Sequence, residues 1–161
     1  MCGIAGYVGD RESADVLVDA LSKLEYRGYD SAGIAVFDHG NIKVKKCKGR
    51  LANLVEKMDE EGKPQGHVGI GHTRWATHGE PSDINSHPHG NKRVTIVHNG
   101  IIENYKKLKD FLVGEGYSFA SETDTEVAAK LLDYYYDGDP MKTIAKVLSC
   151  LLYTSPSPRD S

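Results

Sequence analysis

The chain has 161 residues, of which 39% are hydrophobic, and its formal net charge is −3. This length fits one domain, and 20 basic against 23 acidic side chains give no support for a nucleic-acid-binding protein, which usually carries a basic excess. No apolar run approaches the roughly 18 residues of a membrane span, and no basic segment precedes the first apolar stretch, as a secretory signal requires. Cys2, Cys47 and Cys150 are odd in number and far apart, which favours a reducing cytoplasm over a disulfide framework.

Apolar periodicity predicts the elements of the first half of the chain. Residues 3–8 form a short apolar run, typical of a buried strand, and residues 13–24 have helical spacing behind Ser13, which can cap the helix. Residues 32–37 and 42–48 flank Asp38-His39-Gly40-Asn41, which predicts two strands joined by a tight hairpin. Residues 51–58 predict a short helix, and residues 67–73 predict another strand.

The second half of the chain predicts one strand, at residues 94–98, and three helices. The helices are expected at residues 104–115, from the capping box Thr123-Asp124-Thr125-Glu126 to about Tyr136, and from Pro140 onward. Residues 74–93 have no clear period, and a loop of this length inside a compact domain is usually functional. Residues 151–161 are rich in Ser and Pro, so we expect a domain at 2–150 and an unrelated or disordered tail at 151–161.

Cys2 is the chemical centre of the sequence. Removal of Met1 would leave Cys2 as the N-terminal residue, with a nucleophilic thiol and an α-amine on the same residue. The reference pKa of such an amine is about 7.7–8.0, so it can accept the thiol proton directly or through one water, and no separate histidine is required. The alternative is a small buried side chain without a chemical role.

Four further residues carry groups that suit an amide substrate. A side-chain amide beside a glycine N–H, as in Asn99-Gly100, can form an oxyanion hole. The alternative is a type I′ hairpin turn. Residues 101–104, however, are expected to enter a helix instead of a returning strand. Arg74 ends a strand and suits a substrate carboxylate, whereas Asp124 lies in the first turn of a helix and suits a substrate ammonium group. Their alternatives are a surface ion pair for Arg74 and an interaction with the helix dipole for Asp124.

Six of the seven histidines lie between positions 67 and 98, which raises the question of a metal site. These histidines lack His-Glu-x-x-His spacing, and no cysteine pair accompanies them. The strand-like offset of His87 and His89 is expected to point their rings apart. We therefore expect structural or supporting roles for most of them and neither a metal nor another cofactor; a His-based metallohydrolase remains the weakest hypothesis.

Five segments occur in order along the chain: Cys2-Gly3-Ile4-Ala5-Gly6, Arg27-Gly28-Tyr29-Asp30-Ser31-Ala32-Gly33, His72-Thr73-Arg74-Trp75-Ala76-Thr77-His78-Gly79, His98-Asn99-Gly100-Ile101-Ile102-Glu103-Asn104 and Ser121-Glu122-Thr123-Asp124-Thr125-Glu126. Together they closely resemble the glutaminase domain of the glucosamine-6-phosphate synthase family. Members of this family are also called glutamine:fructose-6-phosphate aminotransferases (isomerizing). Within the class II glutamine amidotransferases, these segments are more similar to this branch than to amidophosphoribosyltransferase or asparagine synthetase. The match covers about residues 2–147.

The resemblance implies an α+β fold, the αββα sandwich of the N-terminal nucleophile hydrolases, incomplete at the C-terminus. It implies that Cys2 attacks the side-chain amide of L-glutamine, giving ammonia and a glutamyl thioester that water hydrolyses. In this family the residues at the positions of Asn99 and Gly100 form the oxyanion hole. By the same resemblance, Arg74 would bind the α-carboxylate of glutamine and Asp124 its α-amine.

The resemblance also assigns roles to residues around the expected glutamine-binding pocket. Thr77 and His78 would line it, Trp75 would lie on the loop that closes over glutamine, and Arg27 would stand close to the nucleophile. The family's sugar isomerase domains, which bind fructose 6-phosphate, are absent from this chain, so we expect the glutaminase half alone or, as an alternative, a truncated inactive fragment. Full-length members are expected to be homo-oligomers, and neither nucleic acid nor membrane is expected as a partner.

Overall fold

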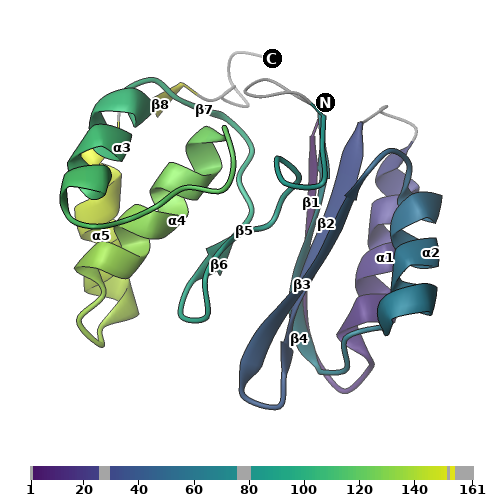
Figure 1. Ribbon diagram of the computed structural model, residues 1–161. Coiled ribbons are helices and arrows are strands. Elements are labelled where there is room, and N and C mark those ends of the chain that lie inside the picture. Colours follow the sequence, from purple (N-terminus) through teal and green to yellow (C-terminus); the bar gives the residue numbers. More distant parts are fainter. Residues whose placement is uncertain (1, 26–29, 76–80, 152, 155–161) are drawn as a thin grey trace, which may run out of the picture.

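One half of the structure is a four-stranded antiparallel sheet covered on one face by two helices (Figure 1). The structure is a computed structural model that describes residues 2–25, 30–75, 81–151 and 153–154. The strands are β1 (Gly3–Val8), β2 (Ser31–Asp38), β3 (Asn41–Lys48) and β4 (Val68–Arg74), in the order β1-β4-β2-β3. The helices are α1 (Ser13–Leu24) and α2 (Leu51–Glu61). Because β1 pairs with β4, the N-terminal end of the chain lies beside the C-terminal end of β4.

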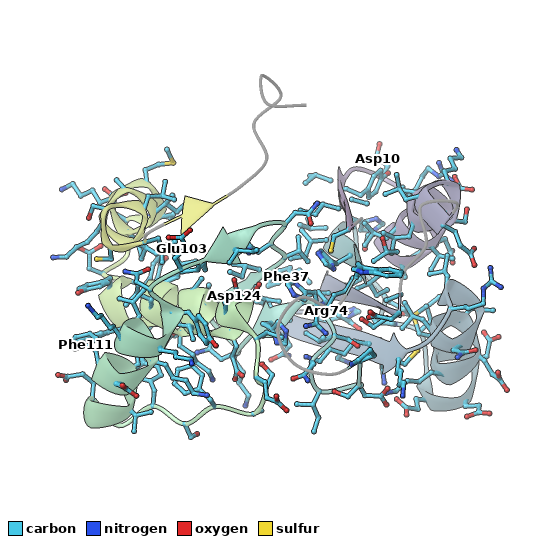
Figure 2. All side chains as sticks on the ribbon, turned by 90° about the horizontal axis from the view of Figure 1, so that it is seen from above. Asp10, Phe37, Arg74, Glu103, Phe111 and Asp124 are labelled. Carbon is cyan, nitrogen blue, oxygen red and sulfur yellow. The ribbon has the colours of Figure 1, made fainter. Side chains whose placement is uncertain are left out.

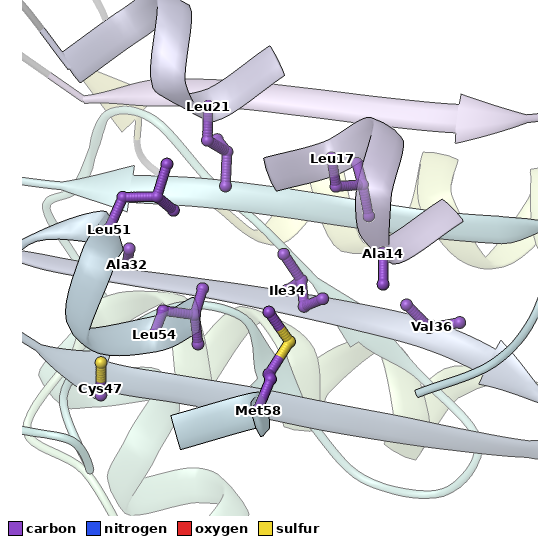
Figure 3. Packing of buried hydrophobic residues seen from close by; sticks show 10 residues of the cluster. All are labelled: Ala14, Leu17, Leu21, Ala32, Ile34, Val36, Cys47, Leu51, Leu54 and Met58. Atoms are coloured by element: carbon purple, nitrogen blue, oxygen red, sulfur yellow. The ribbon is translucent and has the colours of Figure 1, made fainter. Parts of the chain in front are cut away.

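The main hydrophobic core lies between this sheet and its two helices. Leu17 and Leu21 of α1 are fully buried, as the spacing of one helical turn predicts, and they pack with Ile34 of β2 and Leu54 of α2 (Figure 3). Burial of such side chains is worth about 1.5–3 kcal/mol each. The sheet is therefore a rigid support for residues at its edges and ends.

The other half of the structure contains three helices and two pairs of very short strands (Figure 1). The helices are α3 (Tyr105–Gly114), α4 (Asp124–Tyr135) and α5 (Pro140–Cys150), and the pairs are β5 (His89–Gly90) with β6 (Thr95–Ile96) and β7 (Ile101–Ile102) with β8 (Tyr153–Thr154). The three helices share a second core of Leu112, Val127, Leu131 and Val147. Figure 1 shows β5 and β6 between α4 and the four-stranded sheet, whereas β7 and β8 lie at the top of the picture. The expected helix–sheet–sheet–helix order is therefore followed, but two separate two-stranded pairs stand in place of one second sheet.

The helices and the hairpin were predicted well. The strand at residues 3–8 and the helix at residues 13–24 are confirmed, and the hairpin closes through His39 and Gly40, whose φ angles are 50° and 84°. The second helix is three residues longer than predicted, and β4 is shifted by one residue. The last two helices begin as expected, since the side chain of Thr123 accepts from the N–H of Glu126 and Asp139 caps α5.

Several predictions are wrong in detail. Ser13 is the first residue of α1 and not its cap, because its hydroxyl donates instead to the carbonyl of Gly66 at 2.9 Å. The expected strand at residues 94–98 is reduced to Thr95–Ile96, since only these residues pair with β5. Ile101–Ile102 form a strand, which pairs with Tyr153–Thr154 in the segment expected to be disordered. Residues 152 and 155–161 lie outside the described residues, and the proposed domain boundary stays a prediction.

Of the helices in the described ranges, none has both the length and the apolar character needed to cross a membrane.

Candidate functional site

Cys2 lies at the end of the sheet, beside the last residues of β4. The register of β1 and β4 places Gly3 opposite Thr73, and the N–H of Gly3 donates to the hydroxyl of Thr73 at 3.2 Å. The main-chain N–H of Trp75 donates to Cys2 Sγ at 3.2 Å, and Sγ contacts the carbonyl of Trp75 at 3.6 Å. Cys2 is half-buried, so its sulfur is held in place by main-chain groups while remaining accessible.

Asn99 reaches Cys2 from the other half of the molecule. Its Nδ2 donates to the carbonyl of Cys2 at 3.0 Å, across 97 positions of sequence. A primary amide has two N–H groups, so this bond fixes the side chain and uses only one of them. Gly100 follows at a φ of 153°, between β6 and β7. The structure therefore brings Asn99, one of the two predicted oxyanion residues, into contact with Cys2.

Arg74 and Asp124 lie on opposite sides of the boundary between the two halves (Figure 2), and the charge of Asp124 acts on Arg74. Arg74 is the last residue of β4 and Asp124 the first of α4, and both are buried, with 3% and 4% of their surface exposed. Burial lowers the pKa of Arg74, whereas the charges of Asp30, Cys2 and Asp124 raise it; a guanidinium stays protonated in either case. Asp124 Oδ2 also accepts from the N–H of Ile102 at 2.9 Å. Arg74 is thus close enough to both Cys2 and Asp124 for their charges to raise its pKa, as the clamp hypothesis requires.

The remaining predicted site residues are only partly placed. The side chain of Trp75 is 53% exposed, and its main chain contacts the sulfur of Cys2. Arg27, Thr77 and His78 lie outside the described residues, and so does the part of the predicted loop that contains Thr77 and His78. Sequence reasoning missed Thr73 and Asp30. The charge of Asp30 raises the pKa of Arg74, and the N–H of Asp30 donates to the carbonyl of Arg74 at 2.9 Å. The sequence signal that could have identified Asp30 as a site residue is its place in the second of the five segments.

Three histidines form a buried stack between β4 and α4. The rings of His72 and His87 stack at 4.1 Å, and His87 meets His89 edge-on at 4.8 Å. The expectation that His87 and His89 point apart is wrong, because strand β5 begins only at His89. His89 Nε2 lies 3.0 Å from the hydroxyl of Thr123, the cap of α4, so the stack connects the sheet to that helix. Within the described ranges, no group of three or more His, Cys, Asp or Glu side chains is arranged to hold a metal ion.

We expect the protein to lose stability between pH 6.5 and 4, because these histidines are buried in their neutral form. Burial lowers the pKa of His72 to about 4 and that of His89 to about 3, whereas an unfolded histidine has a pKa near 6.5. Below pH 6.5 the unfolded chain therefore binds protons that the folded chain does not, and the free energy of unfolding falls as the pH falls. Each ring contributes up to about 3 kcal/mol of this loss.

Urea unfolding at a series of pH values measures this effect as a shift of the midpoint. Replacement of a buried ring, His89→Gln, is expected to flatten the dependence on pH below 6.5. The same replacement at His67, whose side chain is exposed, is a matched control that should leave the dependence unchanged. Equal pH dependence in the wild type and His89→Gln would contradict the assignment.

Comparisons with known proteins agree with the domain expected from the sequence. Residues 72–150 match the family described as glutamine amidotransferase domain. The chain is 60% identical over 151 residues to the glutamine--fructose-6-phosphate aminotransferase [isomerizing] of Clostridium tetani, covering 92% of this chain and 25% of that protein. It is 52% identical over 153 residues to the protein of the same name in Thermus thermophilus, covering 94% of this chain and 25% of that protein.

Solved structures give the same fold. The glutamine phosphoribosylpyrophosphate amidotransferase of B. subtilis superposes with a TM-score of 0.78 at 27% identity, covering 95% of this chain and 33% of that chain. A structure described as the allosteric regulatory enzyme of purine biosynthesis superposes with a TM-score of 0.81 at 28% identity, covering 95% of this chain and 34% of that chain. The fold expected from the sequence is thus confirmed as that of the N-terminal nucleophile amidotransferases.

The chain thus contains a match to a glutamine amidotransferase domain and has the fold of the N-terminal nucleophile amidotransferases. Within that class its sequence matches the glutaminase part of glucosamine-6-phosphate synthase, as the five segments predicted. The chain spans about a quarter of the length of the curated relatives that it matches.

Proposed function

We propose that this chain hydrolyses the side-chain amide of L-glutamine, with Cys2 as the nucleophile. The observation that carries the proposal is the hydrogen bond from the Asn99 side chain to the main-chain carbonyl of Cys2, which places an uncharged hydrogen-bond donor beside the residue that carries the proposed nucleophilic thiol. The charges of Arg74 and Asp124 near this contact support the same substrate, since a free amino acid presents one carboxylate and one ammonium group.

The reaction proceeds in two steps. After removal of Met1, the α-amine of Cys2 takes the proton of the thiol, and Sγ attacks the amide carbon of glutamine. The oxygen of the tetrahedral intermediate accepts hydrogen bonds from the Asn99 side chain and the N–H of Gly100. As the C–N bond breaks, the amine returns its proton to the leaving nitrogen, and ammonia departs. Water then attacks the glutamyl thioester, which releases glutamate and restores the thiol.

The substrate is held through its α-groups. Arg74 pairs with the α-carboxylate, which the planar guanidinium can bind through two parallel hydrogen bonds, and Asp124 accepts from the α-ammonium group. From the family resemblance alone, we propose that Thr77 and His78 also contribute to glutamine binding and that Trp75 belongs to the loop that closes over the substrate. On the same basis we propose that Arg27 supports the nucleophile.

The wider role of the ammonia follows from the relatives. The relatives that match this chain are named glutamine--fructose-6-phosphate aminotransferases, and they are about four times as long as the matched region. We therefore propose that the ammonia aminates fructose 6-phosphate on sugar isomerase domains outside this chain, and that the longer protein works in the cytoplasm as a homo-oligomer.

The purified chain is expected to convert glutamine into equal amounts of glutamate and ammonia, which coupled assays measure separately. N-acetylglutamine and the α-amide of glutamine keep the reacting amide but lose one α-charge each, so both should be poor substrates if Arg74 and Asp124 form the clamp. Absence of any glutamate from glutamine, in a chain that unfolds cooperatively and lacks Met1 by intact mass, would refute the proposal and favour the inactive fragment.

A further inference from the structure

We propose that His72 is a positioning residue, which holds the oxyanion-hole segment through a hydrogen bond to the main chain of His98. The Nε2 atom of His72 lies 3.0 Å from the carbonyl oxygen of His98, the residue directly before Asn99 and Gly100. The kinetic consequence of this contact rests on the proposed hydrolysis of glutamine, but the contact itself does not.

The chemistry of the contact fixes the tautomer of His72. A carbonyl oxygen only accepts hydrogen bonds, so Nε2 must carry the proton and donate it. The side chain is 1% exposed, and burial lowers its pKa to about 4, which keeps the ring neutral at pH 7. His72 is therefore a permanent single donor and not a group that exchanges protons with the substrate.

The ring has little freedom to move. It stacks on His87 with an angle of 14° between the two planes, so rotation of the His72 side chain would break both the stack and the hydrogen bond. The strand β4 that carries His72 is paired on both sides, with β1 and with β2. The donor is thus fixed relative to the most rigid part of the molecule.

The segment that His72 contacts needs such support. Residues 97–100 lie between β6 and β7 and belong to neither strand. Fixing the carbonyl of His98 fixes the plane of the peptide bond that leads into Asn99. The ring of His98 adds a weaker contact, with Nδ1 at 3.3 Å from the hydroxyl of Thr125.

The arrangement also aligns two parts of the proposed site. Side chains two positions apart on a strand point to the same face, so His72 and Arg74 project from β4 on the same side. One strand thereby positions the residue that binds the α-carboxylate and the segment that binds the oxyanion. Because misplaced groups lose much of their effect on rate, the spacing between these parts is functionally important.

Two substitutions separate the hydrogen bond from the packing of the ring. His72→Phe keeps an aromatic ring that can stack on His87 but has no donor. His72→Gln loses the ring but places an amide N–H at a reach similar to that of Nε2. We expect kcat for glutamine to fall about 10- to 100-fold in His72→Phe, with KM changed less than about 3-fold, since loss of a direct oxyanion donor costs about 10²–10³. His72→Gln is expected to recover most of kcat.

Hydrogen–deuterium exchange provides a readout that does not depend on activity. Peptides covering residues 97–102 should exchange faster in His72→Phe than in the wild type, whereas His72→Gln should resemble the wild type. Peptides from the β2–β3 hairpin should be unchanged in both variants. If the phenyl ring prevents folding, His72→Met serves as the variant without a donor.

The outcomes distinguish the proposals. A wild-type chain without glutaminase activity would refute the proposed function, and the exchange data would still decide whether His72 holds the segment. A larger loss of kcat in His72→Gln than in His72→Phe would show that packing matters and the hydrogen bond does not, which would overturn the inference. Unchanged exchange of residues 97–102 in the variant without a donor would overturn it as well.

Discussion

Replacement of Cys2 by alanine is expected to reduce glutamine hydrolysis to about 10⁻⁴ of the wild-type rate or less, because in the proposed mechanism this residue forms the covalent bond to the substrate. The structure leaves Cys2 accessible and holds its sulfur against the N–H of Trp75, so the substitution should not disturb the fold. Release of glutamate, followed over hours at saturating glutamine, measures the remaining rate. Activity above about a tenth of the wild type would exclude Cys2 as the nucleophile.

The other two cysteines provide matched controls. Cys47 is 6% exposed in the main core, and burial raises the pKa of its thiol, so it should resist alkylation near neutral pH. Cys150 is half-buried at the end of α5, in the half of the molecule that lacks the nucleophile. Cys150→Ala should retain activity and should still be inactivated by iodoacetamide, whereas inactivation that requires Cys150 would contradict the assignment.

A comparison of chains with and without Met1 identifies the group that accepts the thiol proton. If the α-amine of Cys2 accepts the thiol proton, a chain that keeps Met1 has an amide in place of this amine and should be as inactive as Cys2→Ala. Intact mass identifies the two forms in one preparation. Full activity with Met1 in place would show that another group accepts the proton.

The parts of the fold that depend on neighbouring residues were predictable from the sequence. The helices follow from apolar side chains one turn apart, as in Leu17 and Leu21, which are both fully buried. The hairpin follows from a turn in which His39 and Gly40 adopt positive φ, a conformation that glycine accepts readily. These signals are local, so they remain valid wherever the rest of the chain lies.

The parts that depend on distant partners were not predictable. Ser13 donates to a carbonyl 53 residues away, so its role cannot be seen in the helix that it begins. The strand expected at residues 94–98 is short because only Thr95–Ile96 find a partner in β5. The apolar pattern indicates that a segment is buried, but it does not indicate which of its residues pair with another strand.

The candidate site, like the fold, was predictable from the sequence only in part. The proposed roles of Cys2, Asn99 and Arg74 follow from residue type and from the five segments. Their convergence required the register of β1 on β4, which places Cys2 beside Trp75, and the contact of Asn99 with Cys2 over 97 positions. His72 was grouped with histidines of supporting role, and only the structure identifies the carbonyl to which it donates.

Gly33→Ala is expected to destabilise the protein by about 3 kcal/mol, because it separates the sheet from the segment that carries His87. A methyl group at Gly33 would lie 1.9 Å from the carbonyl oxygen of His87 and 2.8 Å from Cβ of Lys46. The obstructing oxygen belongs to the main chain, and His87 is held by its stack on His72. Lys46 Nζ also donates to the carbonyl of Pro88 at 3.2 Å, so the segment cannot shift without losing this bond as well.

Gly6→Ala in the neighbouring part of the same sheet is the matched control. The nearest atom to a methyl group at Gly6 is the carbonyl oxygen of Gly69, at 4.0 Å, which is an ordinary contact distance. Both substitutions restrict the unfolded chain equally, so the difference between their urea midpoints isolates the clash in the folded state. Gly6→Ala should stay within about 0.5 kcal/mol of the wild type. Equal midpoints for the two variants would mean that His87 does not pack against β2, and the stack that joins the two halves would then lose its support.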